Sequence, residues 1–157
     1  MPDTNHLMHP RAANNYADNG YFPTDSATLA GIVKRLDIAG NHIRIFDPCC
    51  GVGDALAFVG GHLGSCGSVC QSYGIDGNRA EAAAGQLDFV VRGDIENCLF
   101  RPKQVGLLFL NPPYGFTAAD QLSTTRTKRL EEIFFDLTVP ALQENGILVL
   151  IVPTTAL

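Results

Sequence analysis

The chain has 157 residues, of which 46% are hydrophobic and 17% are charged. These proportions let a chain of this length bury one hydrophobic core, so we expect one globular domain. The formal net charge of −5 excludes the strongly basic surface that usually binds the phosphate backbone of nucleic acids.

The five cysteines do not have the spacing of a disulfide framework, which favours a reduced, cytoplasmic protein. Cys66 and Cys70 are spaced like half of a metal site, but no second Cys or His pair follows at zinc-like spacing. We therefore expect small buried thiols and no metal. No hydrophobic run approaches the roughly 20 residues of a membrane span, and the first residues lack the order of a signal peptide, so no membrane partner is expected.

Residues 1–20 are polar and have no periodic hydrophobic pattern, which predicts a flexible N-terminal arm. The pattern changes at Thr24 or Asp25, either of which can cap a helix that runs to about Gly40. Residues 42–47 form a short, β-branched and hydrophobic run that stops before a proline, and they predict the first strand.

Strand and helix patterns alternate through the rest of the chain. Two of the hydrophobic runs are nearly continuous, as is typical of strands covered on both faces. The predicted strands are 69–75, 89–91, 105–110 and 146–152, and the predicted helices are 78–84 and 128–143. This alternation predicts an α/β fold with a Rossmann-like, doubly wound and mainly parallel sheet, in one domain of residues 21–157.

The loop after the first predicted strand reads Asp47-Pro48-Cys49-Cys50-Gly51-Val52-Gly53. Its two glycines would let the backbone approach a ligand closely at the start of a helix, although a merely structural tight turn explains them equally well. Leu56 stands where a dinucleotide-binding loop has its third glycine, which argues against a cofactor with a pyrophosphate.

Acidic residues follow the next two predicted strands. Asp76 lies close to the offset of roughly 20 residues after Gly53 at which a carboxylate accepts hydrogen bonds from ribose hydroxyls. Asp94 could accept from the amino group of an adenine, and Ile95 could cover the ring. The alternative for both carboxylates is a structural role at the start of a helix.

The fourth predicted strand ends in Asn111-Pro112-Pro113-Tyr114. Two prolines stop sheet pairing and stiffen the backbone, so the Asn111 amide and the Pro112 carbonyl become two neighbouring acceptors. Such acceptors can bind both hydrogens of a conjugated amine and favour the charge that develops when the amine is methylated. Tyr114 supplies a flat face for a planar substrate.

These residues resemble the class I S-adenosylmethionine-dependent methyltransferases, and among them the amino-group enzymes marked by Asn-Pro-Pro-Tyr, which include the DNA adenine methyltransferases. The resemblance extends from about Gly20 to Leu157, and 111–114 match the catalytic motif at all four positions. The order of the motifs, and the Val-Pro after the last strand, are similar to those of gamma-type DNA adenine-N(6) enzymes.

The resemblance implies S-adenosyl-L-methionine as the cofactor and adenine in DNA as the acceptor. Adenine would be flipped out of the duplex and held by the catalytic residues, with neither a metal nor a strong general base. Asp76 stands where many members have Glu. The residues that the resemblance assigns to the cofactor are Phe22, Pro23, Thr24, Asp47, Pro48, Cys49, Gly51, Gly53, Asp76, Asp94, Ile95 and Asn111, and those that it assigns to catalysis are Asn111, Pro112, Pro113 and Tyr114.

Other acceptors with a planar, amide-like amine fit the same motif, namely bases in ribosomal RNA or a glutamine side chain in a release factor. A non-catalytic binding module is a further alternative. The resemblance also implies further strands and a DNA-recognition region beyond Leu157, where most of the DNA contacts of a restriction-modification type of enzyme would lie. Without those strands, we expect the last strand to be an open edge through which chains could self-associate.

Overall fold

The computed structural model describes residues 21–38, 40–115 and 129–152. The strands in these residues form one parallel sheet in the order β3-β2-β1-β4-β5. The strands are β1 (His42–Asp47), β2 (Val69–Asp76), β3 (Phe89–Arg92), β4 (Val105–Leu110) and β5 (Leu142–Leu150). The predicted arm, 1–20, lies outside the described residues.

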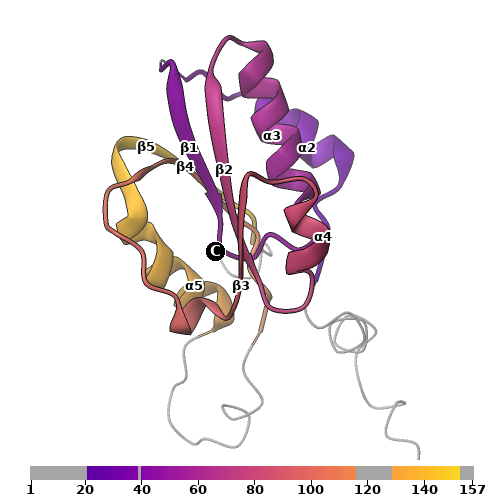
Figure 1. Cartoon of the computed structure of the whole chain (residues 1–157), viewed down its shortest axis with the longest axis vertical. Helices are drawn as coiled ribbons and strands as arrows, with labels where there is room; N and C mark the ends of the chain where they lie inside the picture. Colours follow the sequence, from indigo (N-terminus) through magenta and orange to yellow (C-terminus); the bar gives the residue numbers. More distant parts are fainter. Residues whose placement is uncertain (1–20, 39, 116–128, 153–157) are drawn as a thin grey trace, which may run out of the picture.

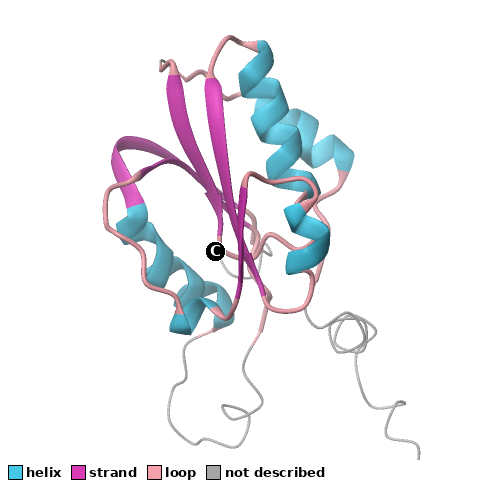
Figure 2. Ribbon diagram, in the orientation of Figure 1, coloured by secondary structure: helices cyan, strands magenta, loops and turns pink. Residues whose placement is uncertain are grey.

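Helices cover both faces of this sheet, as Figures 1 and 2 show, with α2, α3 and α4 on one side and α5 on the other. The helices are α2 (Ser26–Val33), α3 (Asp54–Ser65), α4 (Ala80–Ala84) and α5 (Leu130–Thr138), and the short 3-10 turns are η2 (Ile95–Asn97) and η4 (Val139–Ala141). None of the helices in the described residues is long and apolar enough to cross a membrane. The predicted doubly wound α/β fold is confirmed.

The core lies on both sides of the central strands. Leu107 and Phe109 point to the side of α2 and α3, whereas Leu108 packs with residues beside α5. All three side chains are completely buried. Their burial on two faces explains why 105–110 is hydrophobic without alternation.

Helix α2 is shorter than predicted. Of the two candidate caps, Asp25 is the one that caps it, because its Oδ1 accepts the Thr28 N–H at 2.9 Å. The helix ends at Val33, after which the Arg35 and Leu36 amides bond three residues back instead of four. The hydrophobic spacing continues beyond this end because Leu36 still packs against the core from outside the helix.

The boundary between α5 and β5 differs most from the prediction. A helix over 128–143 is wrong, because α5 stops at Thr138 and Leu142 already belongs to β5. Pro140 accounts for this early end, since proline has no N–H to donate and its ring clashes with the preceding helical turn. The β4–β5 pairing then contains a register shift, and Asn145 has a positive φ of 62° within β5.

The strand order predicts where a ligand site lies on the sheet. The chain runs from β1 outward to β2 and β3, and then returns to the other side of β1 with β4 and β5. In open parallel sheets, ligands bind beyond the carboxyl ends of the strands at the point where this order reverses. That point lies beyond the ends of the paired strands β1 and β4, whose last residues are Asp47 and Leu110. Among the described residues, β5 pairs only with β4.

Candidate active site

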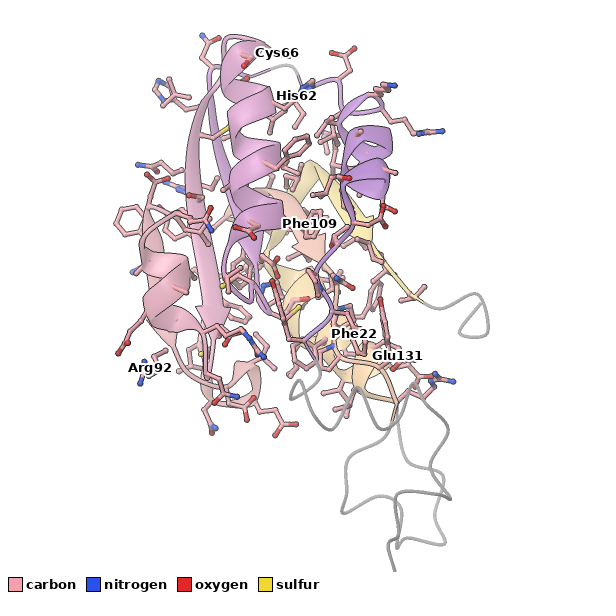
Figure 3. The ribbon with its side chains drawn as sticks, turned by 90° about the vertical axis from the view of Figure 1, so that its right-hand side faces the viewer. Phe22, His62, Cys66, Arg92, Phe109 and Glu131 are labelled. Atoms are coloured by element: carbon pink, nitrogen blue, oxygen red, sulfur yellow. The ribbon has the colours of Figure 1, made fainter. Side chains whose placement is uncertain are left out.

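A cleft of about 390 Å³ opens at the carboxyl ends of the strands. Its volume lies in the range of small-molecule sites. Figure 3 shows Phe22 and Glu131 at this end of the molecule and His62 and Cys66 at the opposite end. Eleven of the predicted site residues line the cleft: Phe22, Pro23, Thr24, Asp47, Pro48, Cys49, Asp76, Asp94, Ile95, Asn111 and Pro113.

Four predicted site residues are not among those that line the cleft. Gly53 starts α3 with a left-handed φ of 92°. Pro112 is fully buried, and Tyr114 lies beside Asn111. Gly51, with a φ of 57°, lies directly beneath the ring of Tyr21, which a Cβ at this position would overlap. Glycine is therefore required at this position for both its backbone conformation and the close approach of the aromatic ring.

Two side chains that shape the cleft are not among the predicted site residues. The Tyr21 ring covers Gly51, and the Arg79 guanidinium lies 4.4 Å from the centre of that ring. This is the geometry of a cation–π contact. Tyr21 directly precedes the predicted Phe22, and Arg79 follows Asp76 by one turn, so proximity to predicted residues was the available signal.

Asp76 has the structural role that was its alternative interpretation. One carboxylate oxygen accepts the Asn78 and Arg79 N–H groups at 2.8 and 2.6 Å. The other accepts the Gly51 N–H at 3.1 Å and so connects the end of β2 to the loop after β1. Each carboxylate oxygen can accept two hydrogen bonds, so the second oxygen keeps capacity for a ligand in the cleft.

The Asp94 carboxylate, in contrast to that of Asp76, does not cap the turn that follows it. It precedes the short turn η2, but its side chain makes no capping hydrogen bond there. The carboxylate is exposed and lines the cleft, while the neighbouring Ile95 is 3% exposed. The structural alternative for Asp94 therefore has no hydrogen bond to support it.

Burial dominates the electrostatics of the loop after β1. Asp47 is 3% exposed, and desolvation raises its pKa to about 7, although the Cys49 N–H donates to its Oδ1 at 2.9 Å. Desolvation also raises the pKa of the Cys49 thiol well above its usual range, so this thiol is neutral. Cys49 Sγ donates to the Asn111 carbonyl at 3.2 Å and ties this loop to the end of β4.

The Asn111 side chain is fixed at both of its polar atoms. Nδ2 donates to the Phe22 carbonyl at 2.9 Å and to Thr24 Oγ1 at 3.1 Å. Oδ1 accepts the Tyr114 hydroxyl at 2.8 Å. The amide oxygen is therefore paired with the neighbouring tyrosine.

The turn after Tyr114 is anchored by α5. Glu131, which is 4% exposed, accepts the Gly115 N–H at 3.1 Å and pairs with Arg129 at 2.5 Å. The Gly115 carbonyl in turn accepts the Leu130 N–H at 2.8 Å. These bonds hold the end of the Asn111–Tyr114 motif against the first turn of the helix.

Structural comparison places this fold among known methyltransferase structures. A protein from Listeria monocytogenes described as a class I S-adenosylmethionine-dependent methyltransferase is 18% identical, with a TM-score of 0.60, over 99% of this chain and 49% of that chain. The YcgJ protein from Bacillus subtilis is 16% identical, with a TM-score of 0.55, over 80% of this chain and 50% of that chain. A geranyl diphosphate methyltransferase in complex with GPP and sinefungin is 16% identical, with a TM-score of 0.55, over 80% of this chain and 44% of that chain. The chain thus has the class I methyltransferase fold and spans about half the length of these proteins.

Comparison of sequences gives the family. No curated protein sequence matches the chain. One family model, described as "Uncharacterised methyltransferase family (DUF6094)", matches residues 3–157. Because this match covers nearly the whole sequence, the chain belongs to this methyltransferase family.

Proposed function

We propose that the chain is the catalytic part of an S-adenosylmethionine-dependent methyltransferase whose acceptor is the exocyclic amine of adenine in DNA. The observation that carries the proposal is the fixed Asn111 amide at the end of β4, beside Tyr114 and facing the cleft. An oriented amide oxygen beside an aromatic ring is suited to a planar amine. The choice of DNA rests on the resemblance of the motif order to gamma-type enzymes.

The residues of the cleft fit the cofactor. Asp76 and Asp94 supply carboxylates for hydroxyl and amino groups, and Ile95 supplies an apolar surface for a ring. Because Gly51 has no side chain, an aromatic ring can lie against its backbone, and the Tyr21 ring does so in this structure. The family and the fold both agree with S-adenosyl-L-methionine, which supplies an electrophilic methyl group when bound.

The chain's own residues would hold the acceptor. An incoming amine donates one hydrogen to Asn111 Oδ1, which accepts one hydrogen bond from the Tyr114 hydroxyl and has a second lone pair for the amine. Its other hydrogen goes to the Pro112 carbonyl, while Tyr114 stacks on the acceptor ring. These acceptors gain strength as the amine becomes positively charged, so they stabilise the transition state more than the ground state.

The test is the identity of the methylated product. The protein, expressed from its complete reading frame, is incubated with labelled S-adenosylmethionine and, separately, unmethylated genomic DNA, total RNA and a cell protein extract. The proposal expects label in N6-methyladenine from DNA. Label in an RNA base or in methylglutamine would replace DNA as the acceptor, and absence of transfer to all three would contradict the proposal.

Asp76→Ala is expected to raise the Kd for S-adenosylmethionine about tenfold. The rate of methyl transfer at saturating cofactor should change less than about threefold. Hydrogen bonds made equally in the ground and transition states affect binding rather than the chemical step, and a tenfold loss matches one hydrogen bond of about 1.4 kcal/mol. Titration calorimetry measures the Kd.

The matched control is Asp88→Ala. Asp88 also accepts a backbone N–H, from Ser72 at 2.7 Å, but it does not line the cleft. This variant should lose stability without losing cofactor affinity. Equal Kd values for the Asp76 variant and the wild type would mean that Asp76 serves only the fold.

A further inference from the structure

We propose that Phe22 and Thr24 are positioning residues of the acceptor site, where they hold the Asn111 amide and the Tyr114 ring in their working orientations. This inference rests on the proposed function, in which Asn111 and Tyr114 contact the acceptor. It gives the segment before α2 a second role beside the cofactor contact that the resemblance implies.

The Asn111 amide can adopt only one of its two orientations. A primary amide has two N–H donors, and both of those on Asn111 are used, one by the Phe22 carbonyl and one by Thr24 Oγ1. If the amide were turned over, its oxygen would face the lone pairs of the Phe22 carbonyl. The segment therefore fixes the nitrogen on its own side and Oδ1 on the side of Tyr114.

The orientation of the Asn111 amide determines whether it can bind an amine. Only Oδ1 can accept a hydrogen from an amine, and a turned amide would present N–H groups to the N–H groups of the acceptor. Thr24 Oγ1 is the part of this lock that a substitution can remove, because the other acceptor is the Phe22 backbone. Loss of Thr24 Oγ1 removes one of the two acceptors on the nitrogen side, so the Phe22 carbonyl alone then holds the amide nitrogen and the orientation of the amide is less strongly fixed.

The Phe22 side chain contacts the Tyr114 ring. The Phe22 and Tyr114 rings are stacked, with centroids 6.2 Å apart and planes that differ by 19°. This lies within the range of interacting aromatic pairs. Since Phe22 comes from the segment to which Asn111 donates, the contact between the two rings restrains the orientation of the Tyr114 ring.

A direct test of the lock uses nuclear magnetic resonance and needs no acceptor. In protein labelled with 15N-asparagine, the Asn111 side-chain signals are identified as those absent from Asn111→Ala. Both N–H protons of this amide should exchange with water at least about tenfold more slowly than those of the exposed Asn41. In Thr24→Val one of the two should lose this protection, and Thr24→Ser should restore it. Equal exchange for Asn111 and Asn41 in the wild type would overturn the proposal.

A kinetic test then asks whether the lock matters for transfer, on the acceptor identified by the product experiment. Thr24→Val should lower the single-turnover rate at saturating substrates about tenfold or more, with the Kd for cofactor within about threefold. Thr24→Ser should recover most of the rate. Thr28→Val is the matched control, because it also removes a threonine hydroxyl, one that donates to Asp25 at 2.6 Å, outside the cleft.

The role of the Phe22 ring is tested in the same assay. Phe22→Leu keeps the backbone carbonyl but loses the ring, so it should raise KM for the acceptor several-fold, whereas Phe22→Tyr should stay close to the wild type. If Thr24→Val instead raises only the cofactor Kd and leaves the saturated rate unchanged, Thr24 acts on the cofactor alone and the proposal is wrong. If the wild type transfers no methyl group, the proposed function fails, while the exchange measurement still decides whether the lock exists.

Discussion

Asn111→Ala is expected to lower the rate of methyl transfer on the order of 100-fold or more, while the Kd for S-adenosylmethionine changes only a few-fold. The amide oxygen acts mainly when the amine gains positive charge, and removal of one such preorganised group costs about this much in other enzymes. The rate is measured in a single turnover at saturating cofactor, and the Kd by calorimetry.

Three other variants show what causes the loss of activity. Asn41→Ala, an exposed asparagine before β1 and at the other end of the sheet from the cleft, should leave both quantities unchanged. Tyr114→Phe keeps the ring and frees Asn111 Oδ1 from the hydroxyl that donates to it, so it should retain far more activity than Tyr114→Ala. The alanine variant loses stacking worth roughly 1 to 3 kcal/mol.

Transfer near the wild-type rate in Asn111→Ala would contradict the mechanism. The amide would then serve only to hold the segment from Phe22 to Thr24, to which its nitrogen donates. A large rise in the cofactor Kd without a change in the saturated rate would point to the same conclusion.

The fold could be predicted from the sequence because its strongest signal is burial. A strand such as Val105–Leu110, covered on both faces, leaves a continuous hydrophobic run in the sequence. The end of α5 could not be placed in the same way, because Leu142 continues the helical spacing although it pairs with Val105 in the sheet. The proline at position 140 was the signal that outweighed this periodicity.

The residues of the candidate site that lie at strand ends could be predicted, because the local sequence determines where a strand ends. Asp47 and Asp76 end β1 and β2, Asp94 and Asn111 follow β3 and β4, and the parallel sheet brings all four to one cleft. The contact of Tyr21 with Gly51 depends on how a distant segment folds over the loop, which no spacing encodes. For the same reason, the bond from Asn111 to Thr24 joins residues 87 positions apart and could only be found in the structure.

The free energy of unfolding should fall as pH rises from about 4 to about 7, relative to Asp47→Asn. Asp47 has a pKa of about 7 in the folded protein because burial disfavours its charged form, whereas in the unfolded chain its pKa is the ordinary 3.8. Below pH 4 the carboxyl is protonated in both states. Between the two values only the unfolded chain loses its proton, so stability is lost across this range, by up to about 4 kcal/mol at 1.36 kcal/mol per unit.

Asp47→Asn removes this titration while it keeps an oxygen that can accept the Cys49 N–H. Urea unfolding at several pH values between 4 and 9 gives the difference in unfolding free energy between the two proteins. Asp25 and Asp88, whose pKa values are lowered by hydrogen bonds, change stability in the opposite direction at low pH, but they are common to both proteins and cancel in the difference. The difference should fall between pH 4 and 7 and become constant above pH 7, where Asp47 is ionised in both states. A difference that does not vary with pH would mean that the carboxyl ionises in the folded cleft at its ordinary pKa, and that water or another group solvates it there.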